Sequence, residues 1–192
     1  YTYQPLFDEN GMKTVASGTV AGDGSLVLNL YYTPDADALA YHANGGQGTM
    51  AATEGVTDQV VEVAANGFER AGYAFVGWNT AADGSGQAYA AGAGYALTAG
   101  DDALFAQWTP NDGTAYTVNH YKVNAAHTAA TLDNAENLNA TTDASVSATP
   151  QTIPGYTYQP LFDENGMKTV ASGTVAGDGS LVLNLYYTPD AD

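Results

Sequence analysis

The residues of this sequence that could hold a metal ion are few and widely spaced. The three histidines are His42, His120 and His127, and cysteine is absent. No histidine is paired with a second histidine or a glutamate at the spacing of a zinc motif. Without cysteine there is no thiolate nucleophile and no disulfide. The sequence therefore predicts no metal site and no cysteine chemistry.

Several short segments place acidic residues beside glycine, a composition that could supply oxygen ligands to calcium. These segments are Asp83-Gly84-Ser85-Gly86, Asp101-Asp102 and Asp178-Gly179. An EF-hand loop needs acidic residues at alternating positions and a closing glutamate, and the segments lack that pattern. Because Asp and Gly favour tight turns, we interpret the segments as turns.

Catalytic motifs are missing as well. The sequence has no nucleophile elbow, no phosphate-binding loop and no Cys-His pair. The adjacent acids Asp8-Glu9 and Asp163-Glu164 diverge on a strand or crowd a turn, so neither pair can be assigned as the two carboxylates of a glycosidase. We predict a protein that is not an enzyme, has no catalytic residue and needs no cofactor.

Aromatic residues are the remaining candidates for binding. Trp78 and Trp108 lie at the ends of expected strands, and Tyr73 and Phe75 alternate toward the same core. Large aromatic side chains contribute the most burial per residue, so we favour core filling over stacking on a sugar ring.

Two pairs of adjacent tyrosines leave a binding role open. In Tyr31-Tyr32 and Tyr186-Tyr187 the side chains must point to opposite faces of a strand, so we expect one tyrosine of each pair to be exposed. A row of exposed tyrosines could bind a glycan or a protein.

Lys122 is the one plausible donor for an intramolecular Lys–Asn isopeptide crosslink, because it lies on an expected strand. Such a crosslink would lower the intact mass by one ammonia, and an unshifted mass would exclude it.

Charge excludes two classes of partner. The 192 residues carry 4 Lys and Arg against 21 Asp and Glu, a net charge of −17. A phosphate backbone would be repelled, and an anionic membrane surface recruits polybasic segments that are missing here. Hydrophobic residues make up 45% of the chain, which favours a folded protein over a disordered one. We predict no nucleic-acid partner and no membrane insertion in this segment.

An internal repeat sets the domain organisation. Residues 1–37 recur without a change at 156–192. Thr-Pro segments that follow aromatic strands, at residues 33–37 and 108–114, have the composition of linkers. We therefore predict three parts: residues 1–37 as the C-terminal half of a preceding repeat, a module at 38–110 and a second module at 111–192.

The local pattern is mainly β. Leu181, Leu183, Leu185 and Tyr187 alternate with Val182, Asn184 and Tyr186, and the same alternation occurs at residues 26–32. Asn165-Gly166 and Asp178-Gly179 are turn signals. Residues 60–64 and 116–123 also have strand composition. Residues 125–138 could hold a turn or short helix capped by Asp133 or Asn134, and the Gly/Ala-rich stretch 88–97 fits no single type of element.

The middle module carries a spaced aromatic pattern that resembles the Listeria-Bacteroides repeat, also called the internalin B-repeat. The matching blocks, in order, are Tyr41-His42-Ala43-Asn44-Gly45-Gly46, Gly72-Tyr73-Ala74-Phe75-Val76-Gly77-Trp78 and Phe105-Ala106-Gln107-Trp108.

The last module looks like a mucin-binding-protein-type (MucBP-like) repeat. The blocks that carry this resemblance are Tyr116-Thr117-Val118-Asn119-His120-Tyr121-Lys122, Ile153-Pro154-Gly155-Tyr156 and Leu181-Val182-Leu183-Asn184-Leu185-Tyr186-Tyr187. Residues 163–172 are longer than the corresponding stretch of that family.

The two resemblances imply a fold and a setting. The fold class would be mainly β (small α+β), with tandem β-grasp or ubiquitin-like modules in an elongated array. The setting would be the cell wall of a bacterium, in an extracellular surface adhesin. There the segment would be a stalk or spacer that projects a distal binding domain, with neighbouring repeats of the same protein as partners. The alternative is that the MucBP-like module itself binds mucin glycans or a host surface glycoprotein through exposed tyrosines and loop residues, although the sequence identifies no individual binding residue.

The unmatched copy yields one further expectation. Residues 1–37 carry the same strands as 156–192, so they can swap onto the 114–150 half of a neighbouring chain and cause self-association. Light scattering with and without residues 1–37 tests this.

Overall fold

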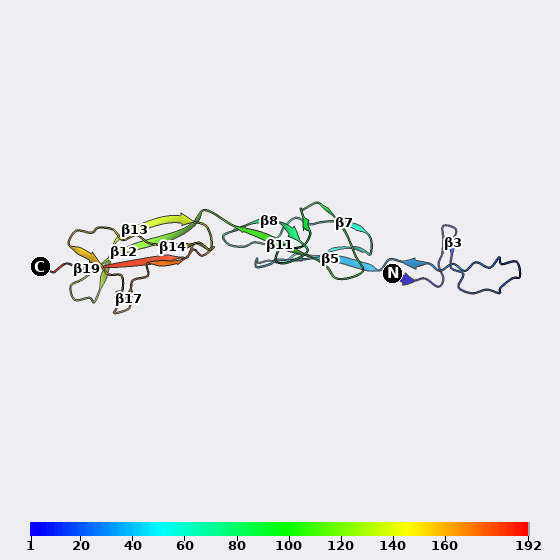
Figure 1. Cartoon of the computed structure of the whole chain (residues 1–192), viewed down its shortest axis with the longest axis horizontal. Coiled ribbons are helices and arrows are strands. Elements are labelled where there is room, and N and C mark those ends of the chain that lie inside the picture. Colours follow the sequence, from blue (N-terminus) through cyan, green and yellow to red (C-terminus); the bar gives the residue numbers. More distant parts are fainter. Residues whose placement is uncertain (192) are drawn as a thin grey trace. The chain divides into compact units, whose positions relative to one another are not determined.

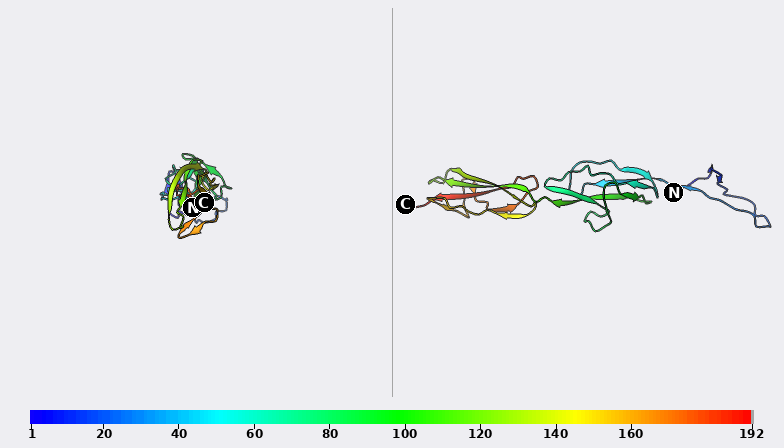
Figure 2. Two further views of the ribbon diagram at one scale, coloured as in Figure 1. Left: turned by 90° about the vertical axis from the view of Figure 1, so that its left-hand side faces the viewer. Right: turned by 90° about the horizontal axis from the view of Figure 1, so that it is seen from above.

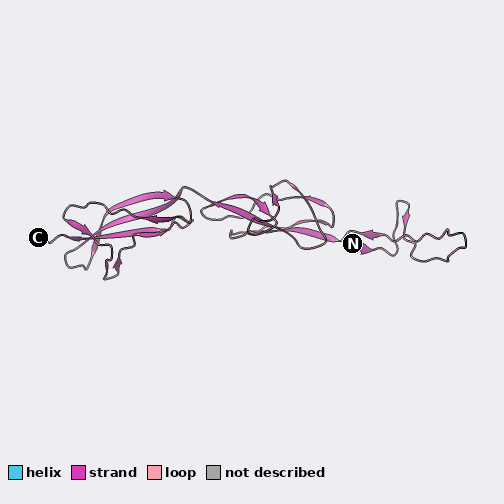
Figure 3. Ribbon diagram, in the orientation of Figure 1, coloured by secondary structure: helices cyan, strands magenta, loops and turns pink. Residues whose placement is uncertain are grey.

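The chain folds into strands joined by turns and loops. The computed structural model describes residues 1–191, and these residues contain no helix (Figure 3). The prediction of a mainly β protein is therefore confirmed. Asp192, the final residue of the predicted third part, lies outside the described residues.

Of the turn or short helix expected in residues 125–138, the turn is present at residues 125–126 and the helix is wrong. Residues 130–140 form β13 (Ala130–Ala140), an antiparallel partner of β12 (Thr114–Val123) over its whole length. Thr131, Asp133 and Asn134 are poor helix formers, so the gain from pairing with β12 decides the local conformation. The stretch 88–97 likewise contains β9 (Ala88–Tyr89) and β10 (Gly94–Ala96).

The described residues divide into two compact units. The first comprises Tyr1–Phe68 and Gly77–Gln107, and the second comprises Glu69–Val76 and the residues from Trp108 onward. The remaining strands are β1 (Thr2–Tyr3), β2 (Asp8–Glu9), β3 (Met12–Lys13), β4 (Tyr32–Thr33), β5 (Ala36–His42), β6 (Thr53–Val56), β7 (Val60–Glu62), β8 (Tyr73–Asn79), β11 (Asp102–Pro110), β14 (Ser145–Ser147), β15 (Tyr156–Tyr158), β16 (Asp163–Glu164), β17 (Met167–Lys168), β18 (Ser172–Thr174) and β19 (Val182–Pro189).

A five-stranded sheet organises residues 36–110. Its strand order is β6-β5-β11-β8-β9, and the two central strands β5 and β11 are parallel. Apolar side chains alternate along β5 and β11, so that one face carries the buried Leu39, Tyr41 and Leu104. Trp78 completes this core, with its ring centroid 5.0 Å from that of Tyr41. The sequence prediction that Trp78 fills a core is confirmed.

The second unit has a four-stranded sheet in the order β13-β12-β19-β15, in which β12 and β19 are parallel (Figure 1). Leu183, Leu185 and Tyr187 of β19 are fully buried on one face, whereas Val182 on the other face is 44% exposed. The predicted alternation of residues 180–188 is thus confirmed. In both sheets the first strand pairs with the next strand as a hairpin and, on its other edge, with the last strand in parallel.

The two copies of the 37-residue segment fold with the same local register. Tyr3 pairs with Tyr32 across β1 and β4, as Tyr158 pairs with Tyr187 across β15 and β19. The Asn-Gly hairpins β2/β3 and β16/β17 also match, which confirms the turn predicted at Asn165-Gly166. Within residues 1–33 the strands are short, and a long open loop joins β3 to β4 (Figure 2).

The two copies of the 37-residue segment differ in solvent exposure. Leu28, Leu30 and Tyr32 are 50%, 53% and 55% exposed, whereas their counterparts Leu183, Leu185 and Tyr187 are 0% exposed. The second copy lies against β12 and β14. In the first copy, residues 27–31 are not part of any strand. Identical sequences therefore have opposite surroundings.

Candidate functional site

A buried polar network lies at the centre of the second unit. His120 is fully buried on β12, and the sequence prediction that it lies in a strand is confirmed. Its Nδ1 lies 2.8 Å from the Tyr187 hydroxyl, and its Nε2 lies 2.8 Å from Glu136 Oε1. The backbone N–H of Gln151 donates to the Tyr187 hydroxyl at 2.9 Å, and the Gln151 side-chain amide donates to Glu136.

Within this network His120 has no ring nitrogen left for a substrate. Both ring nitrogens of His120 are engaged, Nδ1 with the Tyr187 hydroxyl and Nε2 with Glu136, and the Tyr187 hydroxyl also accepts from the Gln151 N–H. A histidine with both nitrogens engaged and no solvent exposure cannot act as an acid or base on a ligand. The network instead connects β12, β13 and β19, and it satisfies the polar groups that the sheet buries.

The other two histidines have separate surroundings. His42 is exposed and stacks on Phe105, with a centroid distance of 4.8 Å. His127 Nδ1 lies 2.9 Å from Glu164 Oε2. Among residues 1–191, no three His, Asp or Glu side chains come together in a way that could hold a metal ion.

The aspartate side chains in two of the acidic turns accept hydrogen bonds from residues of the same turn. Asp83 and Asp178 each accept a bond of 3.0 Å from the backbone N–H of the serine two residues later. The bonds from Ser85 and Ser180 lower the pKa of both carboxyl groups. These are turns that the aspartates themselves stabilise, as the sequence predicts.

Two buried polar residues, Asp102 and Asn79, organise the first unit. The interpretation of Asp101-Asp102 as a turn is wrong for Asp102, which is buried at the start of β11, and Asn79 was not predicted to have a role. Asp102 accepts bonds from the Tyr95 hydroxyl at 2.9 Å and from the Thr98 N–H at 2.6 Å. Asn79 donates to the carbonyls of Gly84 and Gly86 and accepts from two backbone N–H groups, at Ala81 and Gly86. Their positions in the sequence could have indicated burial. Asp102 lies two residues before the buried Leu104 on the same strand, and Asn79 directly follows Trp78.

The buried tyrosines predict a stability limit at high pH. Burial, reinforced by the bond to Asp102, raises the pKa of Tyr95 to about 12, and burial also raises the pKa of Tyr158, Tyr186 and Tyr187. The pKa of these phenols is higher in the folded state than in the unfolded state, where it is about 10. The folded state therefore keeps its full stability below about pH 10 and loses stability as the pH rises further. Absorbance titration should show a delayed tyrosinate fraction that appears together with unfolding. Tyr95→Phe should shrink that fraction; a single titration near the ordinary pKa for every tyrosine would contradict the burial.

The expectation of one exposed tyrosine in each adjacent pair is correct in the first copy and wrong in the second. Tyr31 is half-buried against Phe7 and Tyr32 is exposed. Tyr186 is 9% exposed because Phe162 and Tyr121 stack on its two sides, with centroid distances of 5.5 and 5.1 Å, and Tyr187 lies in the opposite core. All six tyrosines of residues 111–191 are buried or half-buried.

The remaining aromatic candidates are half-buried. Tyr73 donates a hydrogen bond to Asp143, and the Arg70 guanidinium lies 3.7 Å from the centre of its ring. The rings of Phe75 and Trp108 meet edge to face at 5.7 Å. These side chains pack in the second unit and are engaged there, which favours packing over stacking on a sugar.

Lys122 forms an ion pair rather than an amide contact. Its Nζ lies 2.5 Å from Asp133 Oδ1 on β13. A carboxylate in an ion pair has no ammonia to release, so this contact does not support the Lys–Asn crosslink. We keep the intact mass as the test and expect it to be unshifted.

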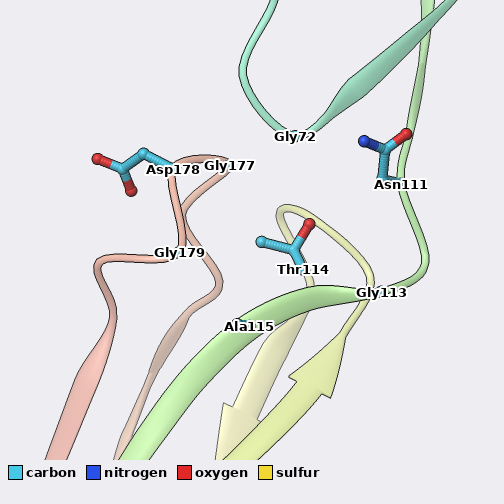
Figure 4. Close-up of a pocket in the computed structure, with 8 residues that line it drawn as sticks. All are labelled: Gly72, Asn111, Gly113, Thr114, Ala115, Gly177, Asp178 and Gly179. Carbon is cyan, nitrogen blue, oxygen red and sulfur yellow. The ribbon is translucent and has the colours of Figure 1, made fainter.

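A depression in the second unit is lined mainly by backbone. It has a volume of about 480 Å³ and is bordered by Gly72, Asn111, Gly113, Thr114, Ala115, Gly177, Asp178 and Gly179 (Figure 4). Asn111 N–H donates to the Gly72 carbonyl at 2.8 Å, and the Asn111 carbonyl accepts from Thr142 N–H at 2.9 Å. With four glycines and one charged side chain, the depression offers little chemistry for recognition.

Glycine is required where two backbones meet beside this depression. A Cβ at Gly177 would lie 2.1 Å from the Ala71 carbonyl oxygen, whereas its counterpart Gly22 has open space. Gly177→Val should lower the free energy of unfolding of the second unit by about 1–3 kcal/mol, the usual cost of overpacking. Gly22→Val is the matched control and should change it by less than about 0.5 kcal/mol. Urea titrations of both variants make the comparison, and equal effects would contradict the close approach.

Comparison with known proteins identifies one part of the chain. Residues 38–107 match the model of the Listeria-Bacteroides repeat domain. A protein of Evansella cellulosilytica described as a "putative membrane protein" is 28% identical over 126 residues, which are 58% of this chain and 19% of that protein. The chain thus spans about a fifth of this relative's length. In residues 1–191 there is no helix with the length and apolarity to cross a membrane.

A solved structure was also matched, described as "Crystal structure of Mub-RV". It is 12% identical, and the match covers 80% of this chain and 98% of the other, with a TM-score of 0.21. A TM-score this low does not establish a shared fold. What the comparisons do support is that residues 38–107 are similar to the Listeria-Bacteroides repeat domain.

Proposed function

We propose that this chain is a non-enzymatic repeat segment of a bacterial cell-surface adhesin, and that it acts as a stalk that separates a distal binding domain from the cell. The observation that carries the proposal is the exact repeat of residues 1–37 at 156–192, in which Tyr3 pairs with Tyr32 as Tyr158 pairs with Tyr187. A length-determining array needs units that fold alike. The repeat domain at residues 38–107 is consistent with such an array.

The state of the polar groups supports a structural role. In the described residues, His120 and Asp102 are buried and saturated with hydrogen bonds, and the acidic turns bond to themselves. None of these groups is presented to a substrate. The proposal includes β-grasp modules at 38–110 and 111–192, the latter MucBP-like, because both sheets place the first strand parallel to the last at their centre.

A display experiment tests the stalk. A reporter binding domain is placed on a bacterial surface above one, two or three copies of residues 1–155. We expect capture of a bulky particle to increase with each added copy, with a reporter fixed directly to the anchor as the control. Capture that does not change with copy number would contradict the spacer role.

Direct binding of mucin glycans or a host glycoprotein by the MucBP-like module is the competing function. It depended on exposed tyrosines, and those of residues 111–191 are buried or half-buried. We therefore expect the purified chain to give no signal on a glycan array. A reproducible signal that survives loss of residues 1–37 would favour the binding function over the stalk.

A further inference from the structure

We propose that residues 1–37 are a binding surface for one defined partner, a polypeptide with the sequence of residues 111–155. The proposal does not depend on the stalk function. It follows from a comparison inside the molecule, in which one copy of a sequence is covered and the other is not.

The exposed face of the first copy is an interaction surface by composition. Val20, Leu28, Leu30 and Tyr32 are 80%, 50%, 53% and 55% exposed, and their counterparts Val175, Leu183, Leu185 and Tyr187 are each 0% exposed. A cluster of large apolar side chains left in water is typical of a surface that a partner covers. The second copy shows which partner does so.

The partner's contacts are defined residue by residue. In the second copy, Thr117–Lys122 of β12 pairs in parallel with residues 182–187, and Ser145–Ser147 of β14 pairs with Ser172–Thr174. The buried side chains that close this core from the partner side are Tyr116, Val118 and Ile153. If the partner binds the first copy in the same register, its Thr117 pairs with Val27 and its Lys122 pairs with Tyr32.

The partner adds the missing backbone pairing as well as the core. Residues 27–31 of the first copy are not in a strand, apart from one isolated bridge between Val15 and Asn29. The same bridge, Val170 to Asn184, persists in the completed copy. The first copy is thus already held in the register that strand addition requires, which lowers the ordering cost of binding.

Stoichiometry decides when binding occurs. Each chain has two copies of the 37-residue segment and one copy of residues 111–155, so an exchange between intact chains forms as many contacts as it breaks. Residues 1–192 should therefore remain monomeric, and this prediction replaces the self-association that we expected from the sequence. Binding becomes favourable when the chain's own second copy is disabled, because the complementary half is then free.

Three variants of the full chain test this. Leu185→Asp places a carboxylate in the core of the second copy and frees residues 111–155. We expect residues 1–37 of another chain to take its place, so the molar mass should rise with concentration to at least twice 19.8 kDa. Leu30→Asp alone should leave a folded monomer. Leu30→Asp/Leu185→Asp should give a monomer with an unfolded second unit.

The molar mass and the strand signal of these variants distinguish the possible outcomes. A monomeric Leu185→Asp chain with a folded second unit supports the proposal if the double variant has lost that fold, because residues 1–37 then bind within their own chain. If the double variant keeps the fold as well, the proposal is overturned. If Leu185→Asp matches the double variant in mass and in loss of strand signal, the proposal is overturned. Failure here would leave the display result for the stalk unaffected.

A cysteine pair distinguishes register-specific binding from aggregation. Asn119 and Asn184 are paired in register, with their side-chain amides 3.2 Å apart. Asn119→Cys with Asn184→Cys in the otherwise intact chain is the positive control. In the Leu185→Asp background, Asn119→Cys with Asn29→Cys should form a disulfide, because Asn29 is the counterpart of Asn184. Aggregation without this disulfide would contradict the proposal.

Discussion

Leu185→Ala is expected to lower the free energy of unfolding of the second unit by about 2–5 kcal/mol, whereas Leu30→Ala should change it by less than about 0.5 kcal/mol. Leu185 is fully buried between β12 and the rest of its core, and Leu30 is 53% exposed. Truncating the buried side chain loses its transfer free energy and leaves a cavity, and truncating the exposed one does neither.

The comparison is unusually well controlled. The two leucines have the same neighbours in sequence over the whole repeated segment, so intrinsic strand propensity and unfolded-state effects are the same for both. Urea unfolding followed by circular dichroism and fluorescence measures the difference. Equal destabilisation by the two substitutions would show that the copies have equivalent surroundings and would contradict the structure.

Trp78→Ala should be the most damaging single change in residues 38–107, with a loss of about 3–5 kcal/mol in the free energy of unfolding. The Trp78 ring is 1% exposed, packs against Tyr41 and Phe68, and donates from Nε1 to the Ala64 carbonyl at 3.1 Å. The substitution therefore removes the largest core side chain and leaves that carbonyl without its donor.

Val60→Ala is the control for the tryptophan, since Val60 lies in the same unit and is 66% exposed. It should change stability by less than about 0.5 kcal/mol. Thermal and urea unfolding should show that Trp78→Ala lowers the stability of the first unit and leaves the transition of the second unit unchanged. A loss under about 1 kcal/mol would mean that the tryptophan is not a central core residue.

Short-range features were predictable from the sequence. The alternation in residues 180–188 identified the buried face of β19, and Asn165-Gly166 identified a hairpin, because side-chain period and turn conformation are local properties. The resemblance of the middle part to a repeat family was carried by aromatic residues such as Trp78, which the core requires.

Long-range pairing was not predictable. Alternation shows which side of β19 is buried and does not show that β12 is its parallel neighbour. For the same reason residues 125–138 were expected to hold a turn or short helix, although pairing with β12 makes residues 130–140 a strand. The polar network of His120, Glu136 and Tyr187 joins residues distant in sequence, so no motif spacing signals it.

The repeat shows the limit of local reasoning most clearly. Leu30 and Leu185 lie in identical sequences, yet one is exposed and the other is buried. No propensity or pattern can separate them, because the difference comes from residues 111–155, which contact one copy only.

Hydrogen exchange measured by mass spectrometry tests this asymmetry most directly. Peptides from residues 27–32 and 182–187 are identical and fall in one mass envelope. With one copy paired to β12 and the other without that partner, the envelope should split into two equal populations, one exchanging fast and one protected. A single envelope at all times would mean that both copies have the same surroundings, and it would contradict the structural asymmetry on which the proposed binding surface rests.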